Sequence, residues 1–162
     1  ANPASNFSVN AGLAYNKARV EEFKLPPGAD ASQLIPKGTP LANAPEWKFA
    51  TGFDWNIETG GFANIEVNGQ LSMQSDQIYE LSPSAAVRRG STVDGYAIVD
   101  LSAALVDPND GWRVAFQVKN LFDKSFASSI VSGGPGGSFR YIIPREADRY
   151  FGITARINFG AN

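Results

Sequence analysis

Six charged residues sit at alternate positions of otherwise apolar segments, and they are the groups best placed to do chemistry. They are Asp54, Glu66, Asp100, Arg113, Lys119 and Arg156. The chain has no histidine and no cysteine, which removes Ser-His-Asp triads, thiolate nucleophiles and the commonest transition-metal ligands. We therefore predict no enzyme, no cofactor and no metal site. The six residues are interpreted as a structural polar network, with direct ligand contact as the less favoured alternative.

A second charged set consists of arginines in or beside two long segments that lack alternation. They are Arg88, Arg89, Arg140, Arg145 and Arg149. Guanidinium groups bind phosphates and carboxylates with paired hydrogen bonds, so this set is a candidate contact for an anionic ligand. The favoured interpretation is that these arginines are solvated or pair with the neighbouring acids Glu80, Glu146 and Asp148.

Net charge limits the partners of the chain. Fourteen basic residues face sixteen acidic ones, which gives a formal charge of −2, and such a balance provides no field to hold a polyanion. We therefore expect no nucleic-acid partner. No apolar run is long enough for a membrane-spanning helix, and the start at Ala1 lacks the basic and apolar regions of a signal peptide. Any export signal is expected to be absent from this chain.

Alternation with a period of two residues predicts six β-strands. The segments are residues 7–15, 47–57, 65–74, 99–105, 112–118 and 151–159. In residues 112–118, for example, Trp112, Val114, Phe116 and Val118 fall on one side and the polar residues on the other. Most of these segments reach or approach the nine to eleven residues that a tilted strand needs to cross a bilayer.

The connections alternate in length. Long segments, residues 24–45, 82–95 and 131–148, follow the first, third and fifth strands, whereas short turns, residues 59–64 and 107–111, follow the second and fourth. If neighbouring strands are antiparallel, the long segments emerge at one end of the sheet and the short turns at the other. Outer-membrane barrels are built in this way.

A soluble sandwich or lipocalin-like barrel is the alternative, because its core face is also apolar. Three features favour the membrane barrel: strands longer than the usual five or six residues, polarised connections, and a polar face rich in amides and small residues. Aromatic residues also lie near segment ends, as in the girdles at membrane interfaces. They are Trp47, Trp55, Trp112, Phe122, Phe126 and Phe159.

Three motifs then resemble the barrel of TonB-dependent outer-membrane receptors. They are Leu41-Ala42-Asn43-Ala44-Pro45-Glu46-Trp47-Lys48, Asp94-Gly95-Tyr96-Ala97-Ile98-Val99-Asp100-Leu101 and Val118-Lys119-Asn120-Leu121-Phe122-Asp123-Lys124. Pro144-Arg145 follows in the last long segment, and the final strand ends on the aromatic Phe159. The order of these motifs is that of the family. Two departures are Phe126, where the family usually has tyrosine, and the residues Gly160-Ala161-Asn162 after Phe159.

The resemblance implies an all-β, antiparallel transmembrane barrel of about 22 strands that encloses an N-terminal plug. Six strands with so polar a face cannot close a water-filled barrel, so residues 1–162 are expected to be its C-terminal part. The plug and the remaining strands are expected to be absent from this chain. The implied function is TonB-dependent uptake of a scarce ligand, such as a metal chelate, cobalamin or a glycan, across the outer membrane of a Gram-negative bacterium.

The same resemblance assigns partners and residue roles. The partners are membrane lipid and lipopolysaccharide, the rest of the barrel with its plug, TonB through the missing N-terminal part, and an unidentified small ligand. Arg88, Arg89, Arg140 and Arg145 become candidate contacts for ligand or lipopolysaccharide, the six alternating charged residues face the lumen, and Phe159 is the expected assembly signal. A soluble ligand-binding sandwich or barrel, and a small outer-membrane barrel that closes by oligomerising, remain the alternatives.

Overall fold

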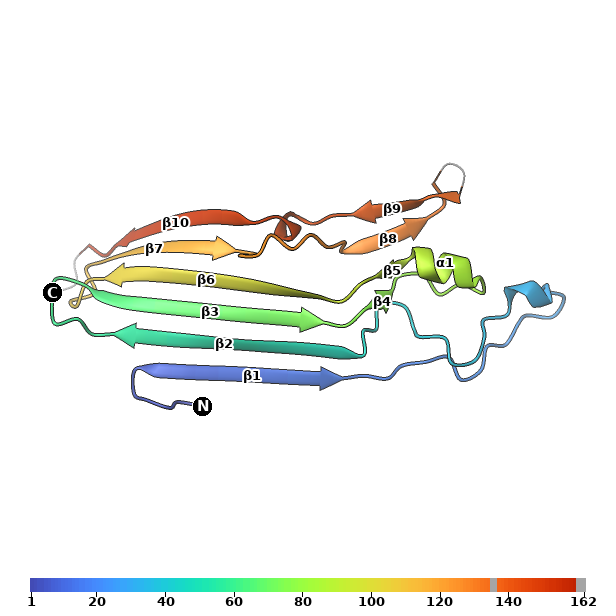
Figure 1. Cartoon of the computed structure of the whole chain (residues 1–162), viewed down its shortest axis with the longest axis horizontal. Helices are drawn as coiled ribbons and strands as arrows, with labels where there is room; N and C mark the ends of the chain where they lie inside the picture. Colours follow the sequence, from blue (N-terminus) through green and yellow to red (C-terminus); the bar gives the residue numbers. More distant parts are fainter. Residues whose placement is uncertain (135–136, 160–162) are drawn as a thin grey trace.

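The computed structural model describes residues 1–134 and 137–159 and contains one six-stranded antiparallel sheet (Figure 1). Its strand order is β1-β2-β3-β6-β7-β10. The bounds are β1 Phe7–Tyr15, β2 Trp47–Ile57, β3 Asn64–Gln74, β6 Tyr96–Val106, β7 Trp112–Lys119 and β10 Tyr150–Ile157. The all-β prediction and the six predicted strands are confirmed. The sheet is open, since β1 and β10 are its edges.

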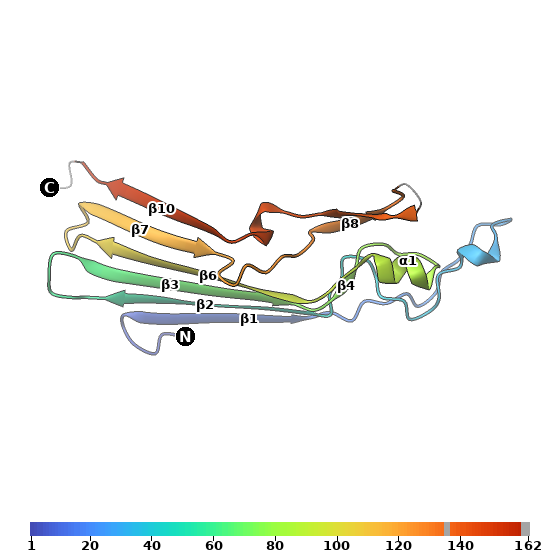
Figure 2. The same ribbon diagram turned by 45° about the horizontal axis from the view of Figure 1, so that its top comes forward.

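The two faces of the sheet differ in chemistry. Directly opposed residues form an apolar row across the six strands, and we call the face that carries it the apolar face. The row consists of Phe7, Trp55, Val67, Ala103, Phe116 and Ile153. Phe116 and Ile153 remain 49% and 76% exposed. The sheet is a single layer (Figure 2), and no second layer among the described residues covers this face, as a soluble sandwich would require.

A glycine on the apolar face lets an aromatic ring lie across the sheet. A Cβ atom added to Gly69 would lie 2.2 Å from Phe53 Cε1 and 3.0 Å from Leu101 Cδ2. Phe53 and Leu101 are the residues opposite Gly69 on the neighbouring strands. The missing side chain on β3 is therefore replaced by the ring from β2, which keeps the face continuously apolar.

The short turns lie at one end of the sheet and the long connections at the other (Figure 1), as predicted. Asp107 builds the turn between β6 and β7, because its carboxylate accepts hydrogen bonds from the amides of Asn109 at 3.3 Å and Gly111 at 3.0 Å. Asp110 in this turn has a φ of 57°, a conformation that aspartate tolerates better than most residues.

The long connections contain short elements that alternation did not predict. These are 3₁₀ turns at Ala31–Gln33 and Arg145–Ala147, strands β4 Gln77–Ile78 and β5 Thr92–Val93, helix α1 Ala85–Gly90, and strands β8 Ser129–Ser132 and β9 Phe139–Ile142. Val93, Ala127 and Ile130 form a small buried cluster between the second and third connections. The ring of Phe139 also packs on Gly90, where an added Cβ would lie 2.0 Å from the ring.

The end of the last strand differs from the prediction. β10 ends at Ile157 instead of continuing to residue 159, and Phe159 lies beyond it with 91% of its surface exposed. The strand ends before Asn158, whose side chain contacts the β6–β7 turn. There its Nδ2 donates a hydrogen bond to the carbonyl of Asp110 at 2.6 Å. The expected tail Gly160-Ala161-Asn162 lies outside the described residues. None of the helices in the described part is both long and apolar enough to span a membrane.

Candidate functional site

The face opposite the apolar one carries a polar row across the whole sheet, and we call it the polar face. Successive directly opposed residues are Ser8, Asp54, Asn68, Ser102, Gln117 and Gly152. The row follows from the two-residue period, because each strand contributes one side chain from the register position that it shares with its neighbour. At the edge the row ends on Gly152, over which the Gln117 side chain lies.

Hydrogen bonds connect four members of this row. Asn68 Nδ2 donates to Asp54 Oδ1 at 2.5 Å, and Ser102 Oγ donates to Asn68 Oδ1 at 3.3 Å. Ser8 Oγ approaches the second oxygen of Asp54 at 3.4 Å. A hydrogen-bonded network therefore crosses from Ser8 on β1 to Ser102 on β6, and the carboxylate of Asp54 is its one charged member.

Two ion pairs join the polar residues of the central strands. Lys119 Nζ lies 2.9 Å from Asp100 Oδ2, and Arg113 Nε lies 2.9 Å from Glu66 Oε2. Arg113 on β7 reaches across β6 to Glu66 on β3, where the intervening residue opposite Glu66 is the small Ala104. All four side chains are about one-third exposed or less, so these pairs are better shielded from water than ordinary surface pairs.

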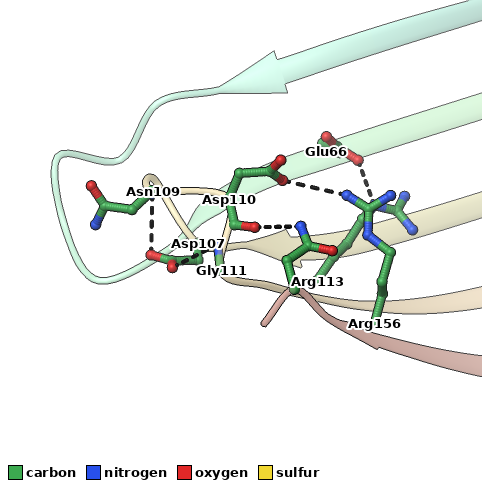
Figure 3. A network of polar contacts seen from close by, with 8 residues as sticks. Glu66, Asp107, Asn109, Asp110, Gly111, Arg113 and Arg156 are labelled. Atoms are coloured by element: carbon green, nitrogen blue, oxygen red, sulfur yellow. Dashed lines mark hydrogen bonds and ion pairs between the residues drawn. The ribbon is translucent and has the colours of Figure 1, made fainter. Parts of the chain in front are cut away.

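The third ion pair lies at the short-turn end. Arg156 Nη2 lies 3.4 Å from Asp110 Oδ1, and both side chains are largely exposed. Figure 3 shows this contact beside the Arg113–Glu66 pair and the Asp107 turn. Arg156 is also directly opposite Arg113 on the neighbouring strand, an arrangement that costs energy unless each cation has its own acid. Asp110 and Glu66 fill that role.

The polar face is hollowed at its centre by a groove of about 320 Å³. Its lining includes the carboxylates of Asp54 and Asp100, the ammonium group of Lys119 and the amides of Asn10, Gln70 and Gln117. These side chains stand on five of the six strands, with β10 the exception. Their chemistry suits hydrogen bonding and ion pairing, and no group of three potential metal ligands occurs in the described part of the chain.

The tight turn after β7 ties the groove to the third long connection. Asp100 Oδ1 accepts a hydrogen bond from the backbone amide of Asn120 at 2.9 Å. Asn120 is 2% exposed and has a φ of 51°. Its side chain accepts from the Lys124 amide at 2.8 Å and donates to the carbonyls of Lys124 at 3.0 Å and Glu146 at 3.2 Å. Asn120 lies within the third sequence motif, which by itself indicates no role for this residue.

The loop arginines differ in what they contact. Arg88 donates to the carbonyls of Ser82 at 2.5 Å and Pro83 at 2.8 Å, so it holds the second long connection together. Arg145 lies over the ring of Tyr150 and Arg149 over that of Phe151, and these neighbouring residues of β10 point to opposite faces. Arg89 and Arg140 are exposed. None of the ion pairs found among the described residues joins these arginines to Glu80, Glu146 or Asp148.

The six charged residues singled out from the sequence stand on the polar face of the sheet. Five of them meet a charged partner: Glu66 with Arg113, Asp100 with Lys119, and Arg156 with Asp110. Asp54 is held by the neutral donors described above. That this face lines a lumen stays a prediction.

The chain matches the model of one protein family. The family model described as TonB dependent receptor-like, beta-barrel, matches residues 3–121. The chain therefore belongs to the TonB-dependent receptor β-barrel family, and the resemblance seen in its motifs is confirmed. A search of curated proteins found no match.

Two solved structures share the fold. The ferric yersiniabactin uptake receptor FyuA from Yersinia pestis superposes with a TM-score of 0.73 over 98% of this chain at 16% identity. The ferric preacinetobactin receptor BauA from Acinetobacter baumannii superposes with a TM-score of 0.59 over 94% of the chain at 15% identity. The matched parts are 22% and 20% of those chains, so this chain spans about a fifth of their length.

Proposed function

We propose that this chain forms the C-terminal wall segment of an outer-membrane receptor that takes up a scarce small ligand in a TonB-dependent manner. One observation carries the proposal: a single open sheet has one face of exposed aromatic and aliphatic side chains and the other of paired polar groups. In a closed barrel the apolar face contacts lipid and the polar face lines the lumen around the plug. Family membership supports the same assignment.

The soluble alternative is disfavoured by the apolar face. Leu13, Phe151 and Ile153 are 67%, 63% and 76% exposed, and a sheet face that exposes many large apolar side chains marks an interaction surface in soluble proteins. The small oligomerising barrel needs the edges of β1 and β10 to pair with other copies of the chain. In the proposed receptor both edges pair with further strands of the same polypeptide.

A ferric chelate is the first ligand to test, because the two similar structures are described as receptors for ferric yersiniabactin and ferric preacinetobactin. The exposed loop arginines Arg89, Arg140 and Arg145 are candidate contacts for an anionic ligand or for lipopolysaccharide phosphate. We place Arg88 in the same set with a second role, since two backbone carbonyls already occupy one of its guanidinium nitrogens. Phe159 is proposed as the assembly signal.

The test uses the complete protein in its native host. We expect the intact protein to be several times the mass of this chain, to fractionate with the outer membrane and to require detergent for extraction. Uptake of radioactive iron from added chelates should fall when the gene is deleted, and should fall equally when TonB is removed. A detergent-independent monomer of the mass of this chain would refute the proposal, and a native oligomer of that mass would favour the oligomerising barrel.

A further inference from the structure

The β8–β9 hairpin stands apart from the six-stranded sheet and lies next to helix α1 of the second long connection (Figures 1 and 2). Its two strands pair only with each other, and each has four residues. An isolated two-stranded hairpin is marginally stable at best in water. Its folded state therefore depends on the surface against which it packs.

The two faces of the hairpin differ in burial. Ile130 is 4% exposed and forms a buried cluster with Ala127 and with Val93 of β5. The neighbouring residue Val131 points to the other face and is 50% exposed. The hairpin thus has one docked face and one exposed face. Because the docked face buries few apolar side chains, its separation from the second connection costs much less than unfolding of the sheet.

Gly90, the last residue of α1, provides the closest contact with the hairpin. A Cβ atom added to Gly90 would lie 2.0 Å from Cε2 and 2.3 Å from Cζ of Phe139, so the ring lies directly on the Gly90 backbone. Tyr141 Oη also donates to the carbonyl of Gly90 at 3.4 Å. The φ of Gly90 is not positive, so the backbone conformation does not require glycine. The ring of Phe139 does.

The surface under the hairpin is itself made of short elements. Strands β4 and β5 have two residues each. They are joined by the amide of Tyr79, which donates to the carbonyl of Ser91 at 2.8 Å, and the hydroxyl of Tyr79 lies 3.5 Å from the carbonyl of Ala127 beside the hairpin. Neither side of the contact is long enough to be stable alone, so each side stabilises the other.

A hollow of about 370 Å³ lies between the two connections. Thr92, Val93 and Asp94 line it from the second connection, and Tyr141 and Ile143 line it from the third. Because both connections contribute to the lining, the hollow keeps its full wall only while the hairpin is docked. The position of the hairpin therefore controls access to this space.

We propose that the β8–β9 hairpin, which we call the strap, is an order–disorder element that folds only when docked on the second connection. In the open state the strap and the β4–β5 pair lose their structure together, while the six-stranded sheet stays folded. The contact of Phe139 with Gly90 holds the strap closed. This inference goes beyond the transport function proposed above and does not depend on the identity of the ligand.

The first experiment measures hydrogen exchange in the complete receptor, purified in detergent, with and without Gly90→Ala. Alanine favours a helix over glycine, so the substitution by itself should stabilise α1, yet its Cβ displaces the ring of Phe139. We expect protection to fall about tenfold in β8 and β9 and to stay unchanged at the centre of β3. Gly12→Ala, with no atom within 4 Å of the added Cβ, should match wild type. The proposal is wrong if β8 and β9 keep wild-type protection, or if β3 loses as much as they do.

A second experiment approaches the same contact from the other side. Phe139→Ala should lower protection in the strap and, by the same factor, at the amide of Tyr79 in the β4–β5 region, because coupling between two parts is reciprocal. The double variant with Gly90→Ala should lose no more protection than the worse single variant, since both changes remove one contact. Additive losses, or a Tyr79 amide as protected as in wild type, would overturn the joint opening.

A thiol probe detects the open state directly. In a purified receptor without other cysteines, Ile130→Cys on the docked face should react slowly with N-ethylmaleimide, and about tenfold faster when combined with Gly90→Ala, since the same opening exposes it. Val131→Cys on the exposed face is the matched control and should react quickly in both backgrounds. Equal rates for the two cysteines without Gly90→Ala would show that the strap is not docked. Failure of the receptor to fractionate with the outer membrane would overturn only the proposed function, because these measurements use purified protein.

Discussion

Replacement of Asn120 by alanine tests how the turn after β7 holds the third long connection. The substitution removes three side-chain hydrogen bonds, two to Lys124 and one to the carbonyl of Glu146. At about 1 kcal/mol for each lost hydrogen bond the cost is about 3 kcal/mol. Alanine at a φ of 51° adds about 1–2 kcal/mol, because a Cβ atom crowds the following carbonyl in the left-handed region. The expected total is about 4–5 kcal/mol.

The assay is native-state hydrogen exchange on the complete receptor, since it reports local opening rather than global unfolding. A loss of about 4 kcal/mol corresponds to a fall of about a thousandfold in protection. We expect this fall in protection at the amide of Lys124 and at the amides of the third long connection near Glu146. The amides at the centre of β3 should stay as protected as in wild type, because the sheet itself is unchanged.

Glycine at the same position provides the matched control. Asn120→Gly loses the same hydrogen bonds but adopts a positive φ without strain, so it should lose less protection than alanine by about 1–2 kcal/mol. The reasoning is refuted if Asn120→Ala exchanges within threefold of wild type. If alanine and glycine give equal losses, the backbone-strain part of the estimate is wrong.

Three further predictions test the faces and ends of the sheet. Phe116→Arg should lower folding stability in lipid vesicles by about 2–4 kcal/mol if the residue lies near the bilayer midplane, whereas Phe116→Val should be mild; wild-type folding of the arginine variant would contradict the lipid contact. Protease added to intact cells should cut the long connections and spare the turn at residues 107–111, and cleavage at that turn alone would reverse the orientation. Gly69→Val should displace the ring of Phe53 and lower the temperature at which the barrel unfolds on a gel, at a cost of about 1–3 kcal/mol. Gly12→Ala is the control and should have no effect, because no atom lies within 4 Å of a Cβ added there.

The sheet was predictable because its signal is local. Each of the six strands is eight to eleven residues long, enough for alternation to be counted within the strand itself. The short elements of the long connections are different: β4 and β5 have two residues each, too few to show a period. They are stabilised by contacts between distant segments, such as Val93 with Ile130. No local pattern reports such contacts, so the sequence showed only long loops there.

The candidate site was predictable in its composition but not in its pairing. Alternation alone puts Glu66 and Arg113 on one face, but their ion pair joins residues 47 positions apart and skips a strand, so it depends on the register of three strands. Asn120 shows a second limit. Its motif was recognisable by resemblance. Asparagine is needed there because the residue has a positive φ and its buried side chain makes hydrogen bonds to Lys124 and to Glu146, which is 26 residues away. Asp100 also accepts a hydrogen bond from the amide of Asn120, so the polar face and the third long connection share one turn. A substitution that displaces either one is therefore expected to displace the other.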